Sequence, residues 1–565
     1  MFQEYDVVVV GSGAGGMAAA ITCAAEGLKV LVLEKTPVIG GSTAVSGGAV
    51  WVPNNHYARA MGIEDSEDAV MAYLSAVLGN ALRPDMMRAY LRRGPEAIEF
   101  FDRNSEVKLS ARAYSPDYYP ELEGAGKAGR PMDPEPYDGR LLGDDFKLLR
   151  DPLKEFTVLG GMMVNVVDVK HLLKVTQSFA SWKHGMKLVL SYFRDRASGY
   201  SRGTRLLMGN ALAARLLKSA RAKGVQVQTQ AEVRQLLRNE GRVIGVRALV
   251  DGKQTEFTAH HAVVLATGGF PWDAELRGER FPKAGGMWSM APRDNTGDGI
   301  RMARGIGADF IDAPADAGLW APVSLWRKPD GSEVRFPHLI WDRAKPGLMA
   351  VNSAGKRFVN EGTSYHEFVR GMYRSHESVP SIPAFLICDR AFIDVWGLGL
   401  ALPGKRPRDH LIRDGYLVEA QSLPELAAKL QVDPAALSDS VARFNQAAEA
   451  GEDKEFGKGS SEYNRYYGDP EKTAGHPNLG PIAAAPFYAV RVYPGDIGTA
   501  SGLRTDADAR VLDGEGKTIA GLYACGNDMA SVMGGHYPGA GITLGPALTF
   551  GYCAGKAIAA SARSA

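Results

Sequence analysis

Residues 5–34 read YDVVVVGSGAGGMAAAITCAAEGLKVLVLE, and this stretch decides the fold. An apolar run rich in valine is followed by a glycine turn, an alanine-rich segment and a second apolar run that ends in an acid. This order predicts a βαβ unit with two buried strands. Gly11, Gly13 and Gly16 have the GxGxxG spacing. The first glycine permits a tight turn, the second lets the backbone approach a pyrophosphate, and the third lets helix and strand pack closely.

A dinucleotide is the ligand that this unit predicts, because the N-terminus of its helix faces the glycine turn and attracts an anion. Glu34 ends the second strand, where its carboxylate can accept hydrogen bonds from ribose hydroxyls. The alternative is a glycine-rich turn that binds no ligand. Two further small-residue stretches, residues 40–43 and 46–48, favour FAD over NAD, because they suit a loop that lies against a flavin and its phosphates.

Later glycine-rich segments extend the predicted cofactor domain. Residues 261–270 read HAVVLATGGF, a buried strand that closes on small residues, and NTGDG follows at 295–299. Residues 521–559 supply another strand, a glycine loop and a helix from about Pro546. The N-terminus of that helix can stabilise negative charge on the pyrimidine end of the flavin. Both ends of the chain are therefore expected to build one domain.

We expect an α/β protein with a Rossmann-like FAD-binding domain built from both chain ends and an inserted α+β catalytic cap domain. The FAD-binding domain is expected over residues 1–312 and 481–565, and the cap over residues 313–480. Inside the cap, the sequence predicts strands near 348–352 and 383–388 and helices near 423–431 and 434–450.

The residues expected to contact FAD lie on the glycine-rich segments and beside them. They are Gly11, Gly13, Ala14, Gly15, Gly16, Glu34, Lys35, Gly41, Ser42, Thr43, Ser46, Gly47, Gly48, Val233, Ala266, Thr267, Gly268, Asn295, Gly297, Asp298, Gly526, Asn527, Gly541, Thr543 and Leu544. No spacing of histidines, cysteines and carboxylates is typical of a metal site, so no metal is expected.

Composition excludes several classes of protein. The 565 residues can bury a large core, and 65 basic against 64 acidic side chains give a net charge of +1, unlike a disordered chain or a globally basic nucleic-acid binder. The cysteines form no CxxC pair, which excludes a zinc ribbon and a disulfide framework; they are Cys23, Cys388, Cys525 and Cys553. Residues 7–25 are uncharged, but GSGAGG interrupts them, so neither a signal peptide nor a membrane span is expected. We expect a cytoplasmic protein.

An insertion at about residues 147–205 stands apart. Over residues 170–205, eight lysines and arginines face one acid, Asp195, for a net charge of +7. Apolar residues recur there at spacings of three and four, which predicts one amphipathic helix; they are Leu172, Val175, Phe179, Trp182, Met186, Val189 and Phe193. Two interpretations stay open. The stripe suits the headgroup layer of an anionic membrane at the inner face of the cell, or it packs as an ordinary helix.

Taken together, the motifs resemble those of the flavoprotein superfamily of fumarate reductases and ketosteroid dehydrogenases, and more closely the bacterial FAD-dependent 3-ketosteroid Δ1-dehydrogenases. The resemblance runs nearly from end to end and includes PDYYPE at 116–121, VNSAGKRFVNE at 351–361 and VMGGHYPGAGITLGPALTFGY at 532–552. The glycine segments indicate only the superfamily, whereas PDYYPE and YPGAG are more discriminating. The implied activity is the 1,2-dehydrogenation of 3-ketosteroids in steroid degradation.

Three departures bear on the substrate and the cofactor. Fumarate and succinate enzymes use an arginine in an NRLGG-like segment to hold a dicarboxylate, whereas this chain has neutral HYPGAG, so we expect a substrate that is uncharged at its reacting end. Relatives with covalent flavin carry a histidine where this chain reads Gly41-Ser42-Thr43, so we expect noncovalent FAD. Ala540 replaces a proline that is common in the family, which loosens the loop that presents Gly541.

The resemblance implies four catalytic residues. The Tyr537 hydroxyl and the Gly541 backbone N–H would donate to the C3 carbonyl oxygen of the steroid and stabilise enolate character. Tyr365 would take the C2 proton, and Tyr118 would lower the pKa of Tyr365 or relay the proton. The hydride from C1 would pass to flavin N5, because amino acids lack a hydride acceptor.

Alternatives remain for individual residues and for the function. Tyr119 competes with Tyr118, because adjacent side chains point in different directions. Structural roles are favoured over catalytic ones for the nearby polar residues His366, His536, Asp294 and Asp298. Competing functions are a flavin enzyme acting on another enone, such as a Δ4-(5α)-3-ketosteroid dehydrogenase, and a flavin electron carrier without substrate turnover. We expect an electron acceptor such as a quinone.

Overall fold

The computed structural model describes residues 3–339, 342–404, 406–469, 471 and 475–564. The expected βαβ unit is present as β1 (Gln3–Val10), α1 (Ala14–Ala25) and β2 (Val30–Leu33). The two strands are parallel, with Val7 paired with Val30 and Val10 with Leu33. The paired residues are buried, which explains why both strands read as continuous apolar runs.

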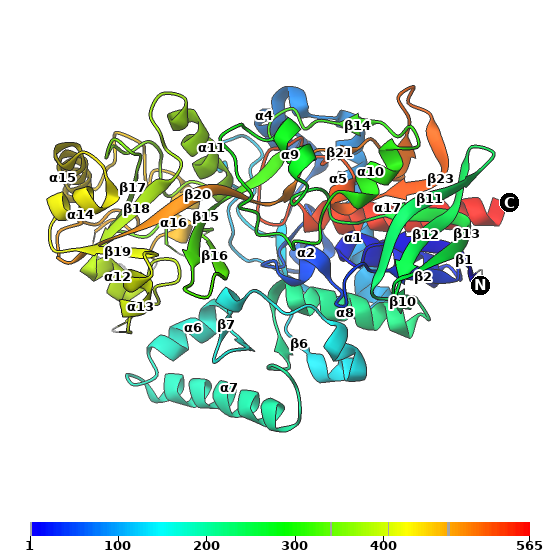
Figure 1. Ribbon diagram of the computed structural model, residues 1–565, viewed down its shortest axis with the longest axis horizontal. Helices are drawn as coiled ribbons and strands as arrows, with labels where there is room; N and C mark the ends of the chain where they lie inside the picture. Colours follow the sequence, from blue (N-terminus) through cyan, green and yellow to red (C-terminus); the bar gives the residue numbers. More distant parts are fainter. Residues whose placement is uncertain (1–2, 340–341, 405, 470, 472–474, 565) are drawn as a thin grey trace.

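Residues from both chain ends share the main sheet. β23 (Thr518–Ala524) lies parallel to β13 (Lys253–Leu265), and β13 lies parallel to β1. Figure 1 accordingly shows the two termini on the same side of the molecule. The other strands of this sheet are β10 (Gln226–Gln228), β11 (Ala231–Asn239), β12 (Arg242–Val250) and β22 (Arg510–Leu512).

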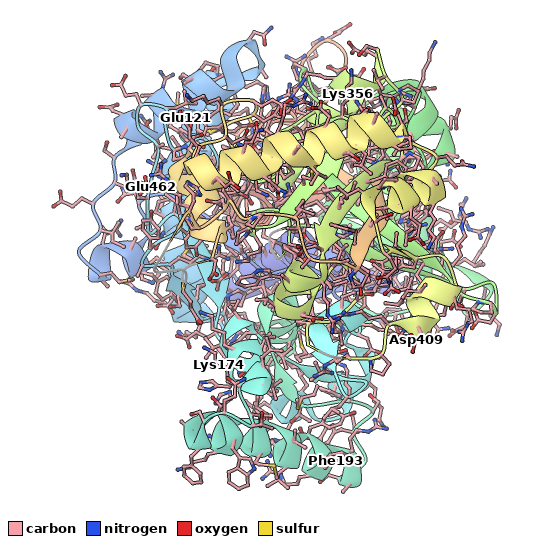
Figure 2. The ribbon with its side chains drawn as sticks, turned by 90° about the vertical axis from the view of Figure 1, so that its left-hand side faces the viewer. Glu121, Lys174, Phe193, Lys356, Asp409 and Glu462 are labelled. Carbon is pink, nitrogen blue, oxygen red and sulfur yellow. The ribbon has the colours of Figure 1, made fainter. Side chains whose placement is uncertain are left out.

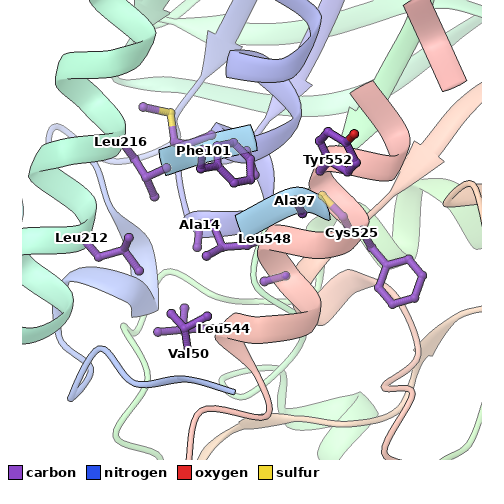
Figure 3. Packing of buried hydrophobic residues seen from close by; sticks show 14 of the residues in the cluster. Ala14, Val50, Ala97, Phe101, Leu212, Leu216, Cys525, Leu544, Leu548 and Tyr552 are labelled. Atoms are coloured by element: carbon purple, nitrogen blue, oxygen red, sulfur yellow. The ribbon is translucent and has the colours of Figure 1, made fainter. Parts of the chain in front are cut away.

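The last helix, α17 (Leu544–Ser564), packs closely along α1. A Cβ atom added at Gly551 would lie 2.4 Å from the backbone oxygen of Gly15, so the close approach of the two helices requires a glycine there. In Figure 3, Leu548 of α17 lies among buried side chains that include Ala14 of α1 and Phe101 of α5 (Pro84–Asn104). The C-terminal helix therefore belongs to the core of the cofactor domain.

A second sheet forms the cap, which lies on the side of the molecule away from the termini (Figure 1). Its strand order is β16–β15–β20–β18–β17, and β19 also pairs with β20. The predicted strands and helices are present as β17 (Leu348–Val351), β18 (Ala384–Asp389), α14 (Leu423–Leu430) and α15 (Pro434–Ala450). The other strands are β15 (Gly318–Arg327), β16 (Glu333–Pro337), β19 (Leu417–Ala420) and β20 (Phe487–Thr499).

The domain boundary expected at residue 480 is wrong. β20 is a central strand of the cap sheet, because it pairs with β15 on one side and with β18 on the other. Apolar periodicity marks a strand but does not say which sheet the strand joins, so the sequence assigned β20 to the cofactor domain. The cap therefore runs to about Thr499.

Residues 157–205 project from the lower edge of the molecule in Figure 1. They form α6 (Val166–Leu173) and α7 (Phe179–Ala197), so the single helix expected here is wrong; residues 174–178 separate the two. Of the predicted stripe, Phe179, Trp182 and Phe193 are exposed, whereas Leu172 and Val189 pack against a small cluster of the same segment, so both interpretations of the stripe stay predictions. Among the described residues, no helix is both long and apolar enough to span a membrane.

Candidate active site

A cavity joins the glycine turns of the cofactor domain to side chains of the cap. Its wall contains most of the residues expected to contact FAD. These are Gly11, Gly13, Ala14, Gly15, Glu34, Lys35, Gly41, Ser42, Thr43, Ser46, Gly47, Gly48, Val233, Ala266, Thr267, Gly268, Asn295, Asp298, Gly526, Asn527, Gly541, Thr543 and Leu544. Segments that are hundreds of residues apart in the chain thus form one surface.

Gly16 and Gly297 are the two expected contact residues that lie outside the cavity wall. A Cβ atom at Gly16 would lie 2.2 Å from the backbone oxygen of Gly11, so this glycine lets α1 pack beside β1, as the GxGxxG spacing predicts. Gly297 has a φ of +74° and precedes α10 (Asp298–Arg304), where it turns the chain. The path of the backbone, rather than contact with the cavity, therefore explains both glycines.

Two glycines of the wall are not explained by protein contacts or by a left-handed backbone. A Cβ atom at Gly13 would meet no atom of the described chain closer than 3.9 Å, and a Cβ atom at Gly47 would meet none within 4 Å. A glycine is therefore needed at these two positions only if another molecule fills the space. Gly13 also precedes α1, whose N-terminus attracts an anion. These features fit the pyrophosphate and flavin of FAD.

The acid at the end of β2 is already held in place. One oxygen of the Glu34 carboxylate accepts hydrogen bonds from the Ser12 hydroxyl at 2.5 Å and the Ser12 N–H at 3.2 Å, and the other accepts from the Thr36 N–H at 3.0 Å. The oxygen that faces Ser12 already has two donors. The oxygen that faces Thr36 can still accept from a ribose hydroxyl, because the Thr36 hydroxyl, 3.1 Å away, can donate to the Val38 carbonyl instead. The fixed orientation prepares the carboxylate for that contact.

Tyr118, Tyr365 and Tyr537 meet at the same wall. The Tyr118 and Tyr365 hydroxyl oxygens are 3.0 Å apart. The Tyr537 ring stacks on the Tyr118 ring with centroids 5.6 Å apart, and it meets the Tyr365 ring edge-on at 5.1 Å. All three side chains are buried. The cluster brings a segment near the N-terminus, a cap helix and the C-terminal glycine loop to one point.

The two adjacent tyrosines of PDYYPE have different surroundings. Tyr118 faces the cavity, whereas the Tyr119 hydroxyl turns to Glu367 and donates to its carboxylate at 2.9 Å. The structure thus resolves the ambiguity that the sequence left open, and it favours Tyr118 as the residue of the pair that reaches the cavity.

A buried ion pair, which sequence reasoning missed, fixes the PDYYPE loop. The Asp117 carboxylate lies 2.6 Å from the Arg130 guanidinium and accepts from the Trp51 indole N–H at 2.9 Å. The Pro538 carbonyl of YPGAG accepts from the Tyr118 N–H at 2.9 Å and from the Tyr73 hydroxyl at 2.6 Å. The two motifs are therefore held side by side. An acid beside two tyrosines carries no sequence signal that separates this role from others.

Gly541 has the backbone conformation that its expected role needs. Its φ is +98°, and a Cβ atom there would lie 2.5 Å from the Ala49 carbonyl oxygen, so other residues are excluded sterically. Its N–H has no acceptor within the described residues. Gly541, Thr543 and Leu544 line the cavity where α17 begins, so the N-terminus of this helix faces the cavity, as expected.

The environment of the tyrosines opposes ionisation. Burial raises the pKa of Tyr365 well above its usual value, and the Tyr118 and Tyr537 hydroxyls beside it add to the effect. Burial also raises the pKa of Tyr118 well above normal and that of Tyr537 to about 12. Whether Tyr118 lowers the pKa of Tyr365 or relays its proton stays a prediction.

Nearby polar residues have structural partners. His366 is fully buried, with Nε2 at 3.2 Å from the Asp316 carboxylate and Nδ1 accepting the Trp320 N–H. His536 lies outside the cavity wall, and burial lowers its pKa. Asp298 pairs with Lys35 at 2.9 Å and Asp294 with Arg150 at 3.3 Å. Within the described residues, no group of histidines, cysteines and carboxylates could hold a metal ion.

The sequence did not identify the part of the wall beyond the tyrosines. It includes Arg112, Leu153, Phe156, Met290, Pro337, Leu339 and Tyr467. Arg112 pairs with the Asp133 carboxylate through two hydrogen bonds, of 2.7 and 2.8 Å. Most of these residues are apolar and lie in segments without a motif, so only the three-dimensional arrangement reveals them. They favour a substrate with a large apolar surface.

Comparison with known proteins gives three kinds of match. The chain matches the FAD binding domain family over residues 6–544. It is 40% identical over 566 residues to 4-oxocyclohex-2-ene-1-carboxylate 5-dehydrogenase of Sinomonas cyclohexanicum, covering 99% of this chain and 94% of that protein. It is 38% identical over 573 residues to 3-oxosteroid 1-dehydrogenase of Mycolicibacterium smegmatis, covering 99% and 98%.

Among solved structures, the chain is similar to the crystal structure of 3-ketosteroid Δ1-dehydrogenase from Sterolibacterium denitrificans in complex with 1,4-androstadiene-3,17-dione. The TM-score is 0.90 and the sequence identity 38%, and the match covers 99% of this chain and 100% of that one. The likeness therefore includes the cofactor domain, the cap and the hairpin of α6 and α7.

Proposed function

Because the chain belongs to the FAD binding domain family of flavoproteins, and 3-oxosteroid 1-dehydrogenases of similar length are among its relatives, we propose that it catalyses the FAD-dependent 1,2-dehydrogenation of 3-ketosteroids. The observation that carries the proposal is the meeting of Tyr118, Tyr365 and Tyr537 at a cavity that also contains the glycine turns for the cofactor. Such hydroxyl groups can hold a carbonyl oxygen and move a proton next to it.

Tyr537 and Gly541 hold the carbonyl. The Tyr537 hydroxyl and the Gly541 N–H line the same cavity, and the N–H has no other acceptor within the described chain. Both donate to the C3 oxygen of the substrate, which makes the hydrogens at C2 more acidic because the developing oxyanion is stabilised.

Tyr365 takes the proton from C2. Its hydroxyl lies 3.0 Å from that of Tyr118, so the proton that Tyr365 must lose can pass to Tyr118. The C2–H bond breaks to the base and the C1–H bond breaks with its electron pair, and the C1=C2 double bond forms. When bound, FAD supplies the acceptor for the hydride from C1.

A second candidate is the dehydrogenation of 4-oxocyclohexane carboxylates, which the Sinomonas relative favours. The α-proton chemistry is the same, but a substrate carboxylate needs a free cation. Each cation of the described cavity wall already has a carboxylate partner: Lys35 lies 2.9 Å from Asp298, Arg112 2.7 Å from Asp133, and Arg150 3.3 Å from Asp294. The wall therefore suits a neutral ketone better.

Finer parts of the proposal concern the cofactor, the acceptor and the place of action. FAD is held noncovalently, because Ser42 rather than a histidine lines the cavity at this point and accepts a hydrogen bond from Asn295 at 3.0 Å. A quinone receives the electrons, in the cytoplasm and at the inner face of the cell membrane. The steroid is consumed in a degradation pathway.

One assay tests the proposal. The purified holoenzyme is mixed with an artificial electron-acceptor dye and either a Δ4-3-ketosteroid or 4-oxocyclohexanecarboxylate. The molecular masses of the products are then determined by mass spectrometry. We expect the steroid to lose two hydrogens, with a kcat/KM more than ~10-fold above that of the carboxylate. Turnover of the carboxylate alone, or of neither substrate, would contradict it.

A further inference from the structure

The outer face of α7 is apolar although nothing in the described chain covers it. Phe179, Trp182, Leu190 and Phe193 are 77%, 49%, 61% and 57% exposed. With Met186 they follow spacings of three and four residues, so they line one side of the helix. In Figure 2, Phe193 lies at the lower edge of the molecule, on the side of α7 that faces away from the rest of the chain.

The opposite face of α7 holds the hairpin together. Tyr192 of α7 is buried with Met162 and Val164 in a small hydrophobic cluster of the projecting segment. The buried Asp195 carboxylate accepts hydrogen bonds from both the N–H and the hydroxyl of Thr204, each at 2.9 Å. Because the inner face supplies the packing, the outer stripe is not needed to keep the hairpin folded.

Positive charge borders the outer stripe. Lys183, Lys187 and Arg194 are exposed and form no ion pair within the described residues. The acid of this stretch, Asp195, is buried, so it does not neutralise them at the surface. An exposed apolar stripe beside unpaired lysines and arginine is complementary to a layer of anionic lipid headgroups with acyl chains beneath.

A second copy of this chain is a poorer partner for this surface. A two-fold contact would bring the same face of both copies together and place their unpaired cations close to one another. Like charges across an interface repel, and no exposed acid in residues 170–205 could compensate. The charge pattern therefore distinguishes a lipid surface from a subunit contact.

The chain just before the projecting segment lines the active-site cavity. Leu153 and Phe156 line the cavity and are only half-buried, so they lie at its rim. The chain continues directly from Phe156 into β7 (Thr157–Val158), which pairs with β8 (Met162–Met163) at the base of the hairpin. The rim of the cavity therefore directly precedes the hairpin in the chain.

We propose that the outer face of α7 docks on the headgroup layer of an anionic lipid bilayer, and that docking holds the Leu153–Phe156 rim of the cavity beside the lipid, from which an apolar substrate enters. The docking rests on the hairpin alone, whereas the entry of substrate from lipid rests on the proposed function. The stripe supplies apolar contact and the cations supply attraction, which together give reversible binding without a spanning helix.

Cosedimentation of the holoenzyme with vesicles tests the docking. Vesicles of phosphatidylcholine with phosphatidylglycerol should sediment the native protein at low salt, and pure phosphatidylcholine vesicles should sediment much less. The variant Phe179→Ser, Trp182→Ser, Phe193→Ser should stay in the supernatant. The matched control Met61→Ser, Val395→Ser, Leu402→Ser removes side chains that are 47%, 56% and 51% exposed outside the hairpin and should sediment like the native protein.

A charge variant completes the test. Lys183→Gln, Lys187→Gln, Arg194→Gln should weaken partitioning into anionic vesicles by about 10²-fold, because each cation contributes on the order of tenfold or slightly less. Native protein that stays in the supernatant with anionic vesicles would overturn the proposal. A lipid-free dimer, seen by light scattering, that the serine variant converts to monomer would also overturn it, because the stripe would then be a subunit contact.

Two turnover assays separate this inference from the proposed function. With a 3-ketosteroid dissolved in vesicles, the serine variant should be several-fold slower than the native protein. With the same steroid carried by a water-soluble cyclodextrin, both should turn over equally. Equal rates in the vesicle assay would overturn the entry of substrate from lipid, whereas no turnover by the native protein in either assay would overturn the proposed function and leave the sedimentation result standing.

Discussion

The side chains that face the substrate carbonyl differ in what each must do. Tyr537 donates a hydrogen bond that strengthens as the carbonyl oxygen gains charge, so Tyr537→Phe should lower kcat by about 10²-fold or more while FAD stays bound. Turnover with the dye assay and the visible flavin spectrum check both parts. The Tyr119→Phe variant is the matched control, because the Tyr119 hydroxyl binds Glu367 away from the cavity and its loss should leave kcat nearly unchanged.

The raised pKa of Tyr365 predicts the direction of the pH dependence. Tyr365 must lose its proton to act as the base, and burial with the neighbouring phenols holds its pKa well above the usual value. The fraction of the active, deprotonated form therefore grows as the pH rises, and kcat/KM should increase by about tenfold per pH unit between about pH 6 and 9. A rate that is constant or falls over this range would show that another group takes the proton.

Single residues show where sequence reasoning reached its limit. The types and positions of Tyr118, Tyr365 and Tyr537 could be predicted, because they lie in motifs. Which of Tyr118 and Tyr119 faces the cavity could not, since that depends on the path of the PDYYPE loop. The upward shift of the Tyr365 pKa could not be predicted either, because the burial of Tyr365 beside two other tyrosines is a property of the folded cluster.

At the scale of elements, the PDYYPE and YPGAG loops must stay in contact for the tyrosines to meet. Asp117→Ala removes the carboxylate that pairs with Arg130 at 2.6 Å and binds the Trp51 indole. It should lower the free energy of unfolding by about 3 kcal/mol, because Arg130 loses a buried partner, and it should also lower kcat. Urea denaturation and the dye assay measure the two effects.

The control for this variant lies on the other side of the same arginine. Asp65 contacts Arg130 at 2.8 Å but touches neither loop of the active site, so Asp65→Ala should lower stability without a matching loss of kcat. Equal losses of kcat in the two variants would mean that Asp117 acts only through general stability.

Elements with a strong local pattern could be predicted, and those that depend on distant partners could not. The βαβ unit, β17, β18, α14 and α15 follow from periodicity and turn residues. The assignment of β20 to the cap depends on pairing with β15 and β18, which no local pattern encodes. The amphipathic stretch divides into α6 and α7, and residues of both helices pack on one small cluster: Tyr192 of α7 lies in it, and Val169 of α6 packs against it. No local pattern encodes that packing.

At the scale of the whole molecule, the cofactor groove joins both ends of the chain. Its wall contains Gly13 of the first turn, Asn295 of the middle segment and Asn527 near the C-terminus. Noncovalent FAD should therefore stabilise the entire cofactor domain, by about 2.7 kcal/mol at a free concentration 100-fold above its Kd. Removal of FAD should lower the Tm, and added FAD should restore it.

The same preparation tests the mode of attachment. Acid denaturation should release all of the yellow colour into the supernatant, because Ser42 rather than a histidine lies beside the flavin space. Colour that remains on the precipitated chain would contradict noncovalent binding.

The far part of the substrate cavity is a whole-molecule property that the sequence could not supply. Arg112, Leu153 and Leu339 come from three separate segments, and none of them lies in a motif that marks a binding site. Their shared surface exists only once these three segments have folded against one another.

The central claim is that Tyr365 takes the C2 proton of a 3-ketosteroid, and hydrogen exchange measures that step directly. The holoenzyme is incubated with steroid in heavy water without an electron acceptor, and deuterium at C2 is followed by NMR. The native protein and Tyr119→Phe should incorporate deuterium at C2, whereas Tyr365→Phe, with FAD still bound, should incorporate almost none. Exchange at the native rate in Tyr365→Phe would contradict the assignment of Tyr365 as the base.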